Sequence, residues 1–277
     1  MKIVVGKTSG FCKGVEFTIK EATKLVNNND KVNCLNELVH NERVISDLES
    51  QGMHIVHSLD EVEDNSYLII RAHGDTKETY EEAKKKNIII KDLTCGKIKL
   101  IRKKILNHLN DYYIIIIGKK NHPEALGLLS FAGNNSLIIE NREDISNLQD
   151  KYNNSGLNKI FIVSQTTFNS NKFDKLVNLV KENLTGEIVV DKTICNATSN
   201  RQEETRNLAS VMDAMLIVGG KNSSNTKELE NVAKEECSRV YLIQDKSDLI
   251  NIDLAHVNKL GIMAGASTPN INNKWNK

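Results

Sequence analysis

One short pattern occurs three times in the 277-residue chain and restricts its fold more than any other feature. In each copy an apolar triplet precedes polar residues, a threonine and a cysteine: residues 3–5 with Thr8 and Cys12, 88–90 with Thr94 and Cys95, and 188–190 with Thr193 and Cys195. A charged helical segment follows each cysteine. This order predicts a strand, a turn and a helix, with a thiol at the helix N-terminus, where backbone N–H groups favour the thiolate. Three copies predict three equivalent units.

A second set of polar turns keeps the same register. The separations are 28, 27 and 28 residues for the pairs Cys12–His40, Cys95–His122 and Cys195–Ser223. Each third of the chain reads as about four strands alternating with helices, which predicts a mostly parallel sheet. We therefore expect an α/β protein with three pseudo-equivalent domains at residues 1–94, 95–194 and 195–277. The first would contain strands at residues 3–5 and 32–39.

Polar residues gather where these expected strands end. Ligands of parallel sheets bind beyond the carboxyl ends of the strands. If each domain points one cysteine and two polar turns at a common axis, the three domains surround a single central site.

The composition excludes several classes of protein. With 39% hydrophobic and 26% charged residues, the chain is typical of a soluble globular protein. The longest apolar runs, such as residues 114–117, have the length of a strand and not of a membrane span. A net charge of +1 argues against nucleic acid as the main partner, because the lysine cluster at residues 84–86 is most simply a solvated helix face. Five cysteines and no signal-peptide core indicate a reducing compartment, and we expect a cytoplasmic protein.

Three equivalent cysteines suit one metal centre with three thiolate ligands. Two kinds of centre fit, a Cys3His zinc site and an iron–sulfur cluster with three of its four irons held by protein. An iron left open would bind a substrate oxygen, which indicates catalysis. Because no Cys-x-x-Cys pattern is present, the ligand assignment rests on the repeat, and three buried structural cysteines are the alternative. Cys34 and Cys237 lack the setting of the repeat.

The polar turns have the composition of an anion site. Histidine can donate a charge-assisted hydrogen bond to phosphate, and small polar residues offer hydroxyl, amide and backbone N–H groups. The candidates are His40, His73, His122, Ser223, Ser224, Asn225 and Ser267. No Walker-type glycine spacing accompanies them, so a nucleoside triphosphate is not indicated. A surface or core role is the alternative for any one histidine.

Glu124 is the carboxylate that lies inside one of these turns, beside His122. It could act as a general acid, and Thr166 or Thr167 could relay its proton or orient the substrate. The alternatives are an ordinary carboxylate at a helix N-terminus after Pro123, and an N-cap hydroxyl.

Taken together, these residues resemble the 4-hydroxy-3-methylbut-2-enyl diphosphate reductases, terminal enzymes of the non-mevalonate isoprenoid pathway. The matching segments span nearly the whole chain in family order: residues 10–15, 39–41, 71–74, 122–124, 165–167, 193–198 with 201–202, 223–225 and 265–267.

The resemblance implies a trefoil of three α/β domains around one [4Fe–4S] cluster held by Cys12, Cys95 and Cys195. It further implies that two electrons and two protons remove the substrate's allylic hydroxyl as water, giving isopentenyl and dimethylallyl diphosphate. Glu124 would deliver protons and Thr166 would support the hydroxyl. The diphosphate would be held by His40, His73, His122, Ser223, Ser224, Asn225 and Ser267.

The family also implies an electron donor of ferredoxin or flavodoxin type, and we expect a monomer. Two rivals remain. One is a three-cysteine cluster enzyme of the quinolinate-synthase kind, against which the His-Pro-Glu and Ser-Ser-Asn turns favour a diphosphate over a dicarboxylate. The other is a zinc-dependent structural or binding protein without redox activity.

Three departures from the family pattern concern the middle domain and the tail. Gly96 stands where proline usually follows the second cysteine, and residues 118–124 lack one histidine and one glycine of the family's run. Both changes bear on the shape of the turns of the middle domain. After Pro269 the chain ends at Lys277, where many relatives continue into a helix, and a shorter lid would expose a cluster to oxygen.

Overall fold

The structure is a computed structural model in which residues 1–269 are described. The expectation of a shorter lid falls on residues 270–277, which lie outside the described residues. None of the helices within residues 1–269 is long and apolar enough to span a bilayer.

Three sheets of four parallel strands form the framework, with orders β1-β12-β10-β11, β3-β2-β4-β5 and β7-β6-β8-β9. The strands are β1 (Lys2–Val5), β2 (Val32–Leu35), β3 (Met53–Val56), β4 (Tyr67–Ile70), β5 (Ile89–Asp92), β6 (Tyr113–Ile117), β7 (Ser136–Ile139), β8 (Lys159–Ser164), β9 (Glu187–Val190), β10 (Ala214–Val218), β11 (Val240–Ile243) and β12 (Lys259–Ala264). The predicted α/β class, with four parallel strands per sheet, is confirmed. Arrangement of the three sheets around one central site stays a prediction.

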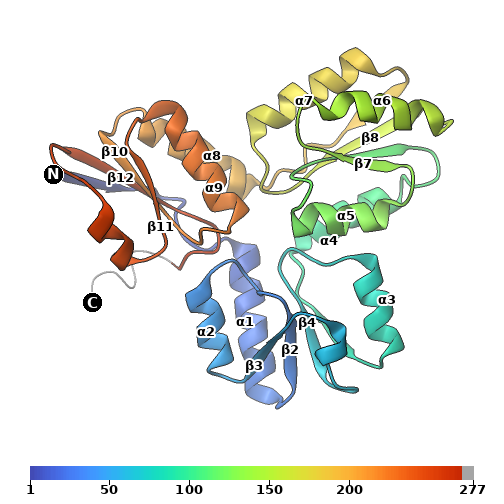
Figure 1. Ribbon diagram of the computed structural model, residues 1–277, viewed down its shortest axis with the longest axis horizontal. Coiled ribbons are helices and arrows are strands. Elements are labelled where there is room, and N and C mark those ends of the chain that lie inside the picture. Colours follow the sequence, from blue (N-terminus) through green and yellow to red (C-terminus); the bar gives the residue numbers. More distant parts are fainter. Residues whose placement is uncertain (270–277) are drawn as a thin grey trace. The chain divides into compact units, whose positions relative to one another are not determined.

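Helices connect the strands, as parallel pairing requires. They are α1 (Lys13–Asn28), α2 (Glu42–Glu49), α3 (Lys77–Lys85), α4 (Gly96–Leu106), α5 (Pro123–Ala132), α6 (Asp144–Asn154), α7 (Ser170–Asn183), α8 (Asn196–Ala209) and α9 (Ser224–Glu236), with short 3-10 turns η1 (Leu59–Glu61) and η2 (Lys246–Asn251). Figure 1 shows the first and the last strand of the chain, the blue strand β1 and the red strand β12, in one sheet.

The chain divides into two compact units. The first unit contains residues 1–19, 39–47 and 195–277, and the second contains residues 20–38 and 48–194. The sheet of β1 and β10–β12 belongs to the first unit, and the other two sheets belong to the second. Helices α1 and α2 each have residues in both units.

Strand β1 departs from the expected grouping of strands. It was predicted in the sheet of residues 1–94, but it pairs with β12 at the edge of the sheet formed by the last third of the chain. The reason lies in the repeat itself. Strands β5 and β9 also precede a cysteine, and each closes the edge of the sheet that comes before that cysteine. No sheet comes before Cys12, so β1 takes the same edge place in the last sheet.

Strand β2 is shorter than the expected strand at residues 32–39, because it ends at Leu35. The next residue, Asn36, has φ 58°, in the left-handed region, where the backbone cannot continue a strand. Its N–H donates to the carbonyl of Val56 at 2.8 Å. His40 therefore lies in a loop beyond the strand and not at its end.

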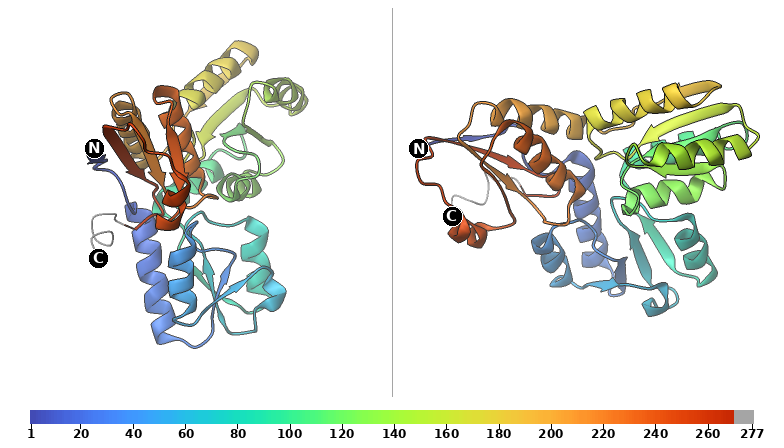
Figure 2. Two further views of the ribbon diagram at one scale, coloured as in Figure 1. Left: turned by 60° about the vertical axis from the view of Figure 1, so that its left-hand side comes forward. Right: turned by 45° about the horizontal axis from the view of Figure 1, so that its top comes forward.

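The sheet of β6–β9 shows why these sequences form strands, because its central strand is buried on both faces. Residues 114–117 are all fully buried isoleucines, as expected for a parallel strand covered on both faces. One face packs against α4 and α5 through side chains such as Ile101 and Leu128. The other packs against α6 and α7 through side chains such as Leu148 and Phe173. Figure 2 shows these two helix pairs on opposite sides of the sheet.

Candidate active site

Each sheet has a topological switch point between its two central strands. From β2 the chain crosses to β3 on one side and then to β4 on the other, and the same holds for β6 with β8 and for β10 with β12. Loops that leave neighbouring strands in opposite directions open a crevice at their carboxyl ends, which is where ligands bind in such sheets. The predicted polar residues lie at these ends.

Their positions are equivalent in the three sheets. His40, His122 and Ser223 each come five residues after the last residue of β2, β6 and β10. The turns after β4, β8 and β12 carry the other predicted residues, although Thr166 lies one position earlier in its turn than His73 and Ser267 do in theirs. The spacing found in the sequence thus reflects one backbone plan used three times.

The three cysteines of the repeat also occupy equivalent positions. Each immediately precedes a helix, with Cys12 before α1, Cys95 before α4 and Cys195 before α8. All three are partly exposed, whereas Cys34 and Cys237 are buried. Burial raises the pKa of the Cys34 thiol to about 12, so it stays protonated and unreactive.

Local hydrogen bonds fix the positions of two cysteines of the repeat. The N–H of Val15 in the first turn of α1 is directed at the Cys12 sulfur, at 3.5 Å. The N–H of Cys12 donates to the carbonyl of Ala266, and the N–H of Cys95 donates in the same way to Ala72. Each of these two cysteines is therefore fastened to a polar turn of its own unit.

The cysteines are divided between the units: Cys12 and Cys195 lie in the first, and Cys95 lies in the second. Within residues 1–269, no group of three His, Cys, Asp or Glu side chains lies close enough together to hold a metal ion. The chemistry of the donors nevertheless fits a thiolate-bound centre, because each half-exposed thiol stands at a helix N-terminus.

In the first unit, the polar turns after β10 and β12 adjoin one another. A side chain at Gly219 would collide with the hydroxyls of Thr226 and Thr268, at 2.6 and 2.9 Å. The backbone of His40 adjoins the same region, since a Cβ at Gly220 would lie 2.3 Å from the His40 carbonyl oxygen. The turns that carry His40, Ser223 to Asn225, and Ser267 are thus brought together.

The Ser-Ser-Asn turn opens helix α9. Ser223 is the N-cap residue, and its hydroxyl accepts a hydrogen bond from the N–H of Thr226 at 3.3 Å. All three residues of the turn are buried. Asn225 is only 4% exposed, yet neither its amide oxygen nor its amide nitrogen has a hydrogen-bond partner among the described residues. Since buried polar groups are almost always hydrogen-bonded, the Asn225 amide stands out within this turn.

In the second unit, Glu124 and Thr166 are in direct contact. The N–H of Thr166 donates to Oε1 of Glu124 at 2.5 Å, and its hydroxyl donates to Oε2 at 2.7 Å. Glu124 is 1% exposed, and this burial raises the pKa of its carboxyl to about 7, although the hydrogen bonds from Thr166 act in the opposite direction. A carboxyl with a pKa near neutrality is suited to proton transfer.

The N-cap alternative for Thr166 is wrong, whereas Glu124 does lie in the first turn of α5 directly after Pro123, as its alternative held. The Thr166 hydroxyl does not cap a helix, because Asn169 is the N-cap of α7. The Glu124 carboxylate lies at the N-terminus of α5 but binds Thr166 from another turn.

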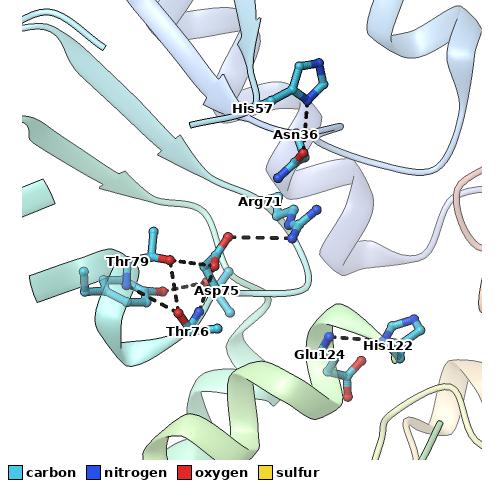
Figure 3. Close-up of polar contacts among 10 residues, drawn as sticks. Asn36, His57, Arg71, Asp75, Thr76, Thr79, His122 and Glu124 are labelled. Atoms are coloured by element: carbon cyan, nitrogen blue, oxygen red, sulfur yellow. Dashed lines mark hydrogen bonds and ion pairs between the residues drawn. The ribbon is translucent and has the colours of Figure 1, made fainter. Parts of the chain in front are cut away.

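His122 caps helix α5. Its Nδ1 accepts a hydrogen bond from the N–H of Glu124 at 3.1 Å, which leaves Nε2 to carry the proton in the neutral ring (Figure 3). The ring of His73 lies edge-on to that of His122, with centroids 5.9 Å apart. Both histidines predicted in the second unit therefore lie together, and His122 contacts Glu124.

The His73 turn is braced by a cluster to which the sequence analysis gave no role. Arg71 forms an ion pair with Asp75 at 3.7 Å, and Asp75 accepts hydrogen bonds from the N–H of Thr76 and the hydroxyl of Thr79 (Figure 3). The backbone of Asp75 packs closely on α5, because a Cβ at Gly127 would lie 3.1 Å from its carbonyl oxygen. The sequence signal for this cluster is the Arg-Ala-His-Gly-Asp order of residues 71–75, which places an arginine and an aspartate on either side of His73.

The departures in the middle domain leave its turns well bonded. Helix α4 begins at Gly96 directly after Cys95, and a Cβ at Gly96 would meet no atom within 4 Å. The N–H of Lys119 donates to the side chain of Gln165, and the N–H of Lys120 donates to Glu140, both at 2.9 Å. These bonds hold the turn that leads to His122.

Arg201 and Glu204 were also missed as site residues. Both lie on α8, and both contact the loop that carries Cys12, about 190 residues earlier in the chain. Arg201 belongs to the family motif, but the motif does not show that its side chain contacts Gly10, which lies about 190 residues earlier in the chain.

Comparison with known proteins gives consistent matches over nearly the whole chain. The family described as LytB protein matches residues 3–274. A 4-hydroxy-3-methylbut-2-enyl diphosphate reductase of Clostridioides difficile is 37% identical over 272 residues, which covers 98% of this chain and 95% of that protein.

Two solved structures are similar as well. The E-1-hydroxy-2-methyl-but-2-enyl-4-diphosphate reductase of Plasmodium falciparum has a TM-score of 0.88 at 30% identity, covering 97% of this chain and 84% of that one. A second structure, of the (E)-4-hydroxy-3-methyl-but-2-enyl diphosphate reductase described as the terminal enzyme of the non-mevalonate pathway, has a TM-score of 0.67 at 32% identity, covering 97% and 94%.

Proposed function

We infer that this chain, which belongs to the LytB protein family, is an oxidoreductase that acts as a 4-hydroxy-3-methylbut-2-enyl diphosphate reductase of the non-mevalonate pathway. One observation carries the proposal. In three sheets of the same topology, a partly exposed cysteine precedes a helix, and polar turns follow the two central strands. A structural or binding protein has no need of that repeated combination.

We propose that Cys12, Cys95 and Cys195 hold one [4Fe–4S] cluster per chain. Their equivalent places before three helices and their partial exposure support this assignment. When bound, such a cluster supplies electrons one at a time and a Lewis-acidic iron without a protein ligand.

The proposed reaction is a reductive dehydroxylation. The allylic C–O bond of (E)-4-hydroxy-3-methylbut-2-enyl diphosphate breaks, and the hydroxyl leaves as water with one proton. Two electrons and a second proton enter the remaining allylic group. The products are isopentenyl and dimethylallyl diphosphate, which differ in the carbon that receives this second proton.

Glu124 is the proposed proton donor. Its burial favours the protonated form up to a pKa of about 7, so the carboxyl carries a proton at neutral pH in a large share of molecules. Thr166 fixes both carboxyl oxygens through its N–H and hydroxyl. The same hydroxyl is the proposed support for the substrate hydroxyl, which would place donor and leaving group side by side.

The diphosphate is the proposed ligand of the polar turns. In the first unit it would take hydrogen bonds from His40, Ser223, Ser224, Asn225 and Ser267, and in the second from His73 and His122. The buried and unsatisfied amide of Asn225 supports this role, because its N–H2 group lacks an acceptor among the described residues. Donors at the N-terminus of α9 favour an anion in addition.

The electrons are proposed to come from a protein of ferredoxin or flavodoxin type. One chain supplies all the proposed ligands, so we propose that the protein acts as a monomer. The free cysteines fit a reducing compartment, and we propose the cytoplasm.

The test is anaerobic purification followed by iron, sulfide and zinc analysis and an assay with the allylic diphosphate and reduced methyl viologen. The proposal predicts about four iron and four sulfide per chain and formation of both products. Cys12→Ser, Cys95→Ser and Cys195→Ser should each lose the cluster, whereas Cys34→Ala and Cys237→Ala, outside the repeat, should keep it. Zinc without iron, or a loaded protein that leaves the substrate unchanged, would contradict the proposal.

A further inference from the structure

Arg201 is a buried cation beside two of the proposed cluster ligands. It lies in the second turn of α8, the helix that begins directly after Cys195, and its side chain is 4% exposed. Taking a guanidinium out of water requires compensation by hydrogen bonds and by negative charge. What supplies that compensation indicates what the residue does.

The hydrogen bonds of Arg201 join the two cysteine segments. One guanidinium nitrogen donates to the carbonyl of Gly10 at 2.6 Å, two residues before Cys12. The other donates to the carbonyl of Ala197 at 2.9 Å, two residues after Cys195. The side chain thus bridges the backbone that carries one cysteine to the backbone that carries the other.

Backbone carbonyls satisfy hydrogen bonds but do not neutralise a charge. Among the described residues no carboxylate lies within ion-pair distance of Arg201, and its Nε has no hydrogen-bond acceptor. Burial lowers the pKa of the guanidinium, and the charges of Cys12, Cys195 and Glu204 act against this, in that order of size. A negatively charged cluster held by Cys12 and Cys195 would supply the counter-charge that the backbone carbonyls lack.

Glu204, one turn further along α8, binds Lys7 and Thr8 and not Arg201. Its carboxylate accepts the N–H of Lys7 at 2.6 Å, and the N–H of Thr8 at 2.8 Å together with the Thr8 hydroxyl. Burial acts to raise the pKa of Glu204, but these bonds outweigh it and leave the pKa below its usual value. Glu204 thus anchors the start of the loop whose end is held by Arg201.

We propose that Arg201 is a positioning residue that fixes Cys12 relative to Cys195 and raises the reduction potential of the cluster through its positive charge. This inference rests on the proposed function, because it requires a cluster at these cysteines. A fixed positive charge stabilises the added electron, since the reduced cluster is more negative than the oxidised one. Removing the charge therefore makes reduction harder.

The experiment is a redox titration of the reconstituted protein, followed by electron paramagnetic resonance, on wild type, R201Q, R201K and R206Q. At a fixed potential, R201Q should show a reduced-to-oxidised ratio at least about tenfold lower than wild type, a shift of about 59 mV for one electron. R201K keeps the charge and should titrate near wild type. Arg206 lies on the same helix in a partly exposed ion pair with Glu235, so R206Q is the matched control and should not shift.

Each outcome of this experiment supports or contradicts the proposed role of Arg201. A wild type that binds no iron and sulfide would overturn the proposed function, and this inference with it. A loaded R201Q that titrates with wild type and R206Q would overturn the inference alone. If R201Q folds but does not load, loading of R201K supports the role of the charge, and failure of R201K beside a loaded R206Q contradicts it. If R201Q does not fold, a tenfold shift in R201K contradicts the role of the charge, and a titration near wild type supports it.

Discussion

Glu124 and Asn225 occupy the same place in two sheets of identical topology. Each is the second residue of the helix that follows a central strand, α5 after β6 and α9 after β10. Both side chains are almost fully buried, at 1% and 4% exposed. The carboxylate of Glu124 accepts two hydrogen bonds from Thr166, whereas the amide of Asn225 has no partner among residues 1–269.

The neighbouring turn explains the difference. The N–H of Gln165 donates to the last residue of β6, and the N–H of Gly265 donates in the same way to the last residue of β10. This common register matches Thr166 with Ala266. In the second unit this turn supplies a hydroxyl that donates to the buried carboxylate, whereas in the first unit the matching residue is alanine and has no hydroxyl.

The sheet of β2–β5 shows that the residue type alone does not make this position like Glu124. There Glu42 holds the corresponding place at the start of α2, but it is exposed. Burial raises the pKa of the Glu124 carboxyl to about 7, and Glu42 lacks that burial. Glu42 is therefore the natural control for Glu124.

The largest effect is expected from Glu124→Gln. Glutamine keeps the shape of the side chain but cannot give up a proton, so turnover of the allylic diphosphate should fall about 100- to 10,000-fold at equal cluster content. The Michaelis constant should change little, because the diphosphate contacts remain. Glu42→Gln should keep the wild-type rate in the same assay. An E124Q enzyme with more than a tenth of the wild-type turnover would refute the proton-donor role.

The effect of burial on Glu124 should also appear in the pH dependence of the free energy of unfolding, without any substrate. The folded pKa of Glu124, about 7, lies above its ordinary value of 4.5, so the folded state binds more protons than the unfolded state between these pH values. The contribution of this group to stability is therefore lost as pH rises from about 4.5 to about 7. Relative to E124Q, the free energy of unfolding of wild type should fall by on the order of 3 kcal/mol over this range.

Urea unfolding of the metal-free proteins at pH 5 and pH 8 measures this difference. A constant gap between wild type and E124Q at both pH values would show that burial does not raise the pKa of Glu124.

Asn225→Ala tests the other half of the comparison. Loss of hydrogen bonds to a charged phosphate, worth about 2 kcal/mol, should raise the Michaelis constant roughly 10- to 100-fold. Stability of the metal-free protein should hardly fall, since the amide has no partner among the described residues. The exposed Asn222 provides the control, and N222A should bind substrate normally. Equal Michaelis constants for both variants would remove Asn225 from the diphosphate site.

The smallest effect is expected from Ala266→Thr, which copies Thr166 into the first unit. A hydroxyl at this place gives Asn225 a partner within the protein, so the substrate must displace it. At about 1 kcal/mol for such a bond, the Michaelis constant should rise several-fold. A266V adds the same bulk without the hydroxyl. If A266T and A266V behave alike, bulk and not hydrogen bonding separates the two sites.

The repeat made much of the fold predictable. Apolar triplets before each cysteine and the constant spacing to His40, His122 and Ser223 led to three sheets of four parallel strands, which the structure has. The sheet to which β1 belongs was not predictable from its composition, because a similar triplet precedes each of the three cysteines. Only pairing across the length of the chain assigns it to β12.

The candidate site was predictable to the extent that it follows strand ends. Thr166 is one of the two threonines predicted to relay the proton of Glu124 or to orient the substrate, and it contacts Glu124, while the role itself stays a prediction. Arg201 and Glu204 escaped notice because their contacts with Gly10 and Thr8 join residues about 190 positions apart. The unsatisfied state of Asn225 was equally hidden, since it depends on which side chains surround the amide in the folded protein.

The most direct test of the central claim, that burial makes Glu124 the proton donor, is the pH dependence of kcat/KM for the allylic diphosphate with reduced methyl viologen. This quantity reports the pKa values of groups in the free enzyme. The account predicts that wild-type kcat/KM falls above a pH of about 7, and that this fall disappears in E124Q. A wild-type profile that stays flat from pH 6 to pH 9, or a fall that persists unchanged in E124Q, would contradict it.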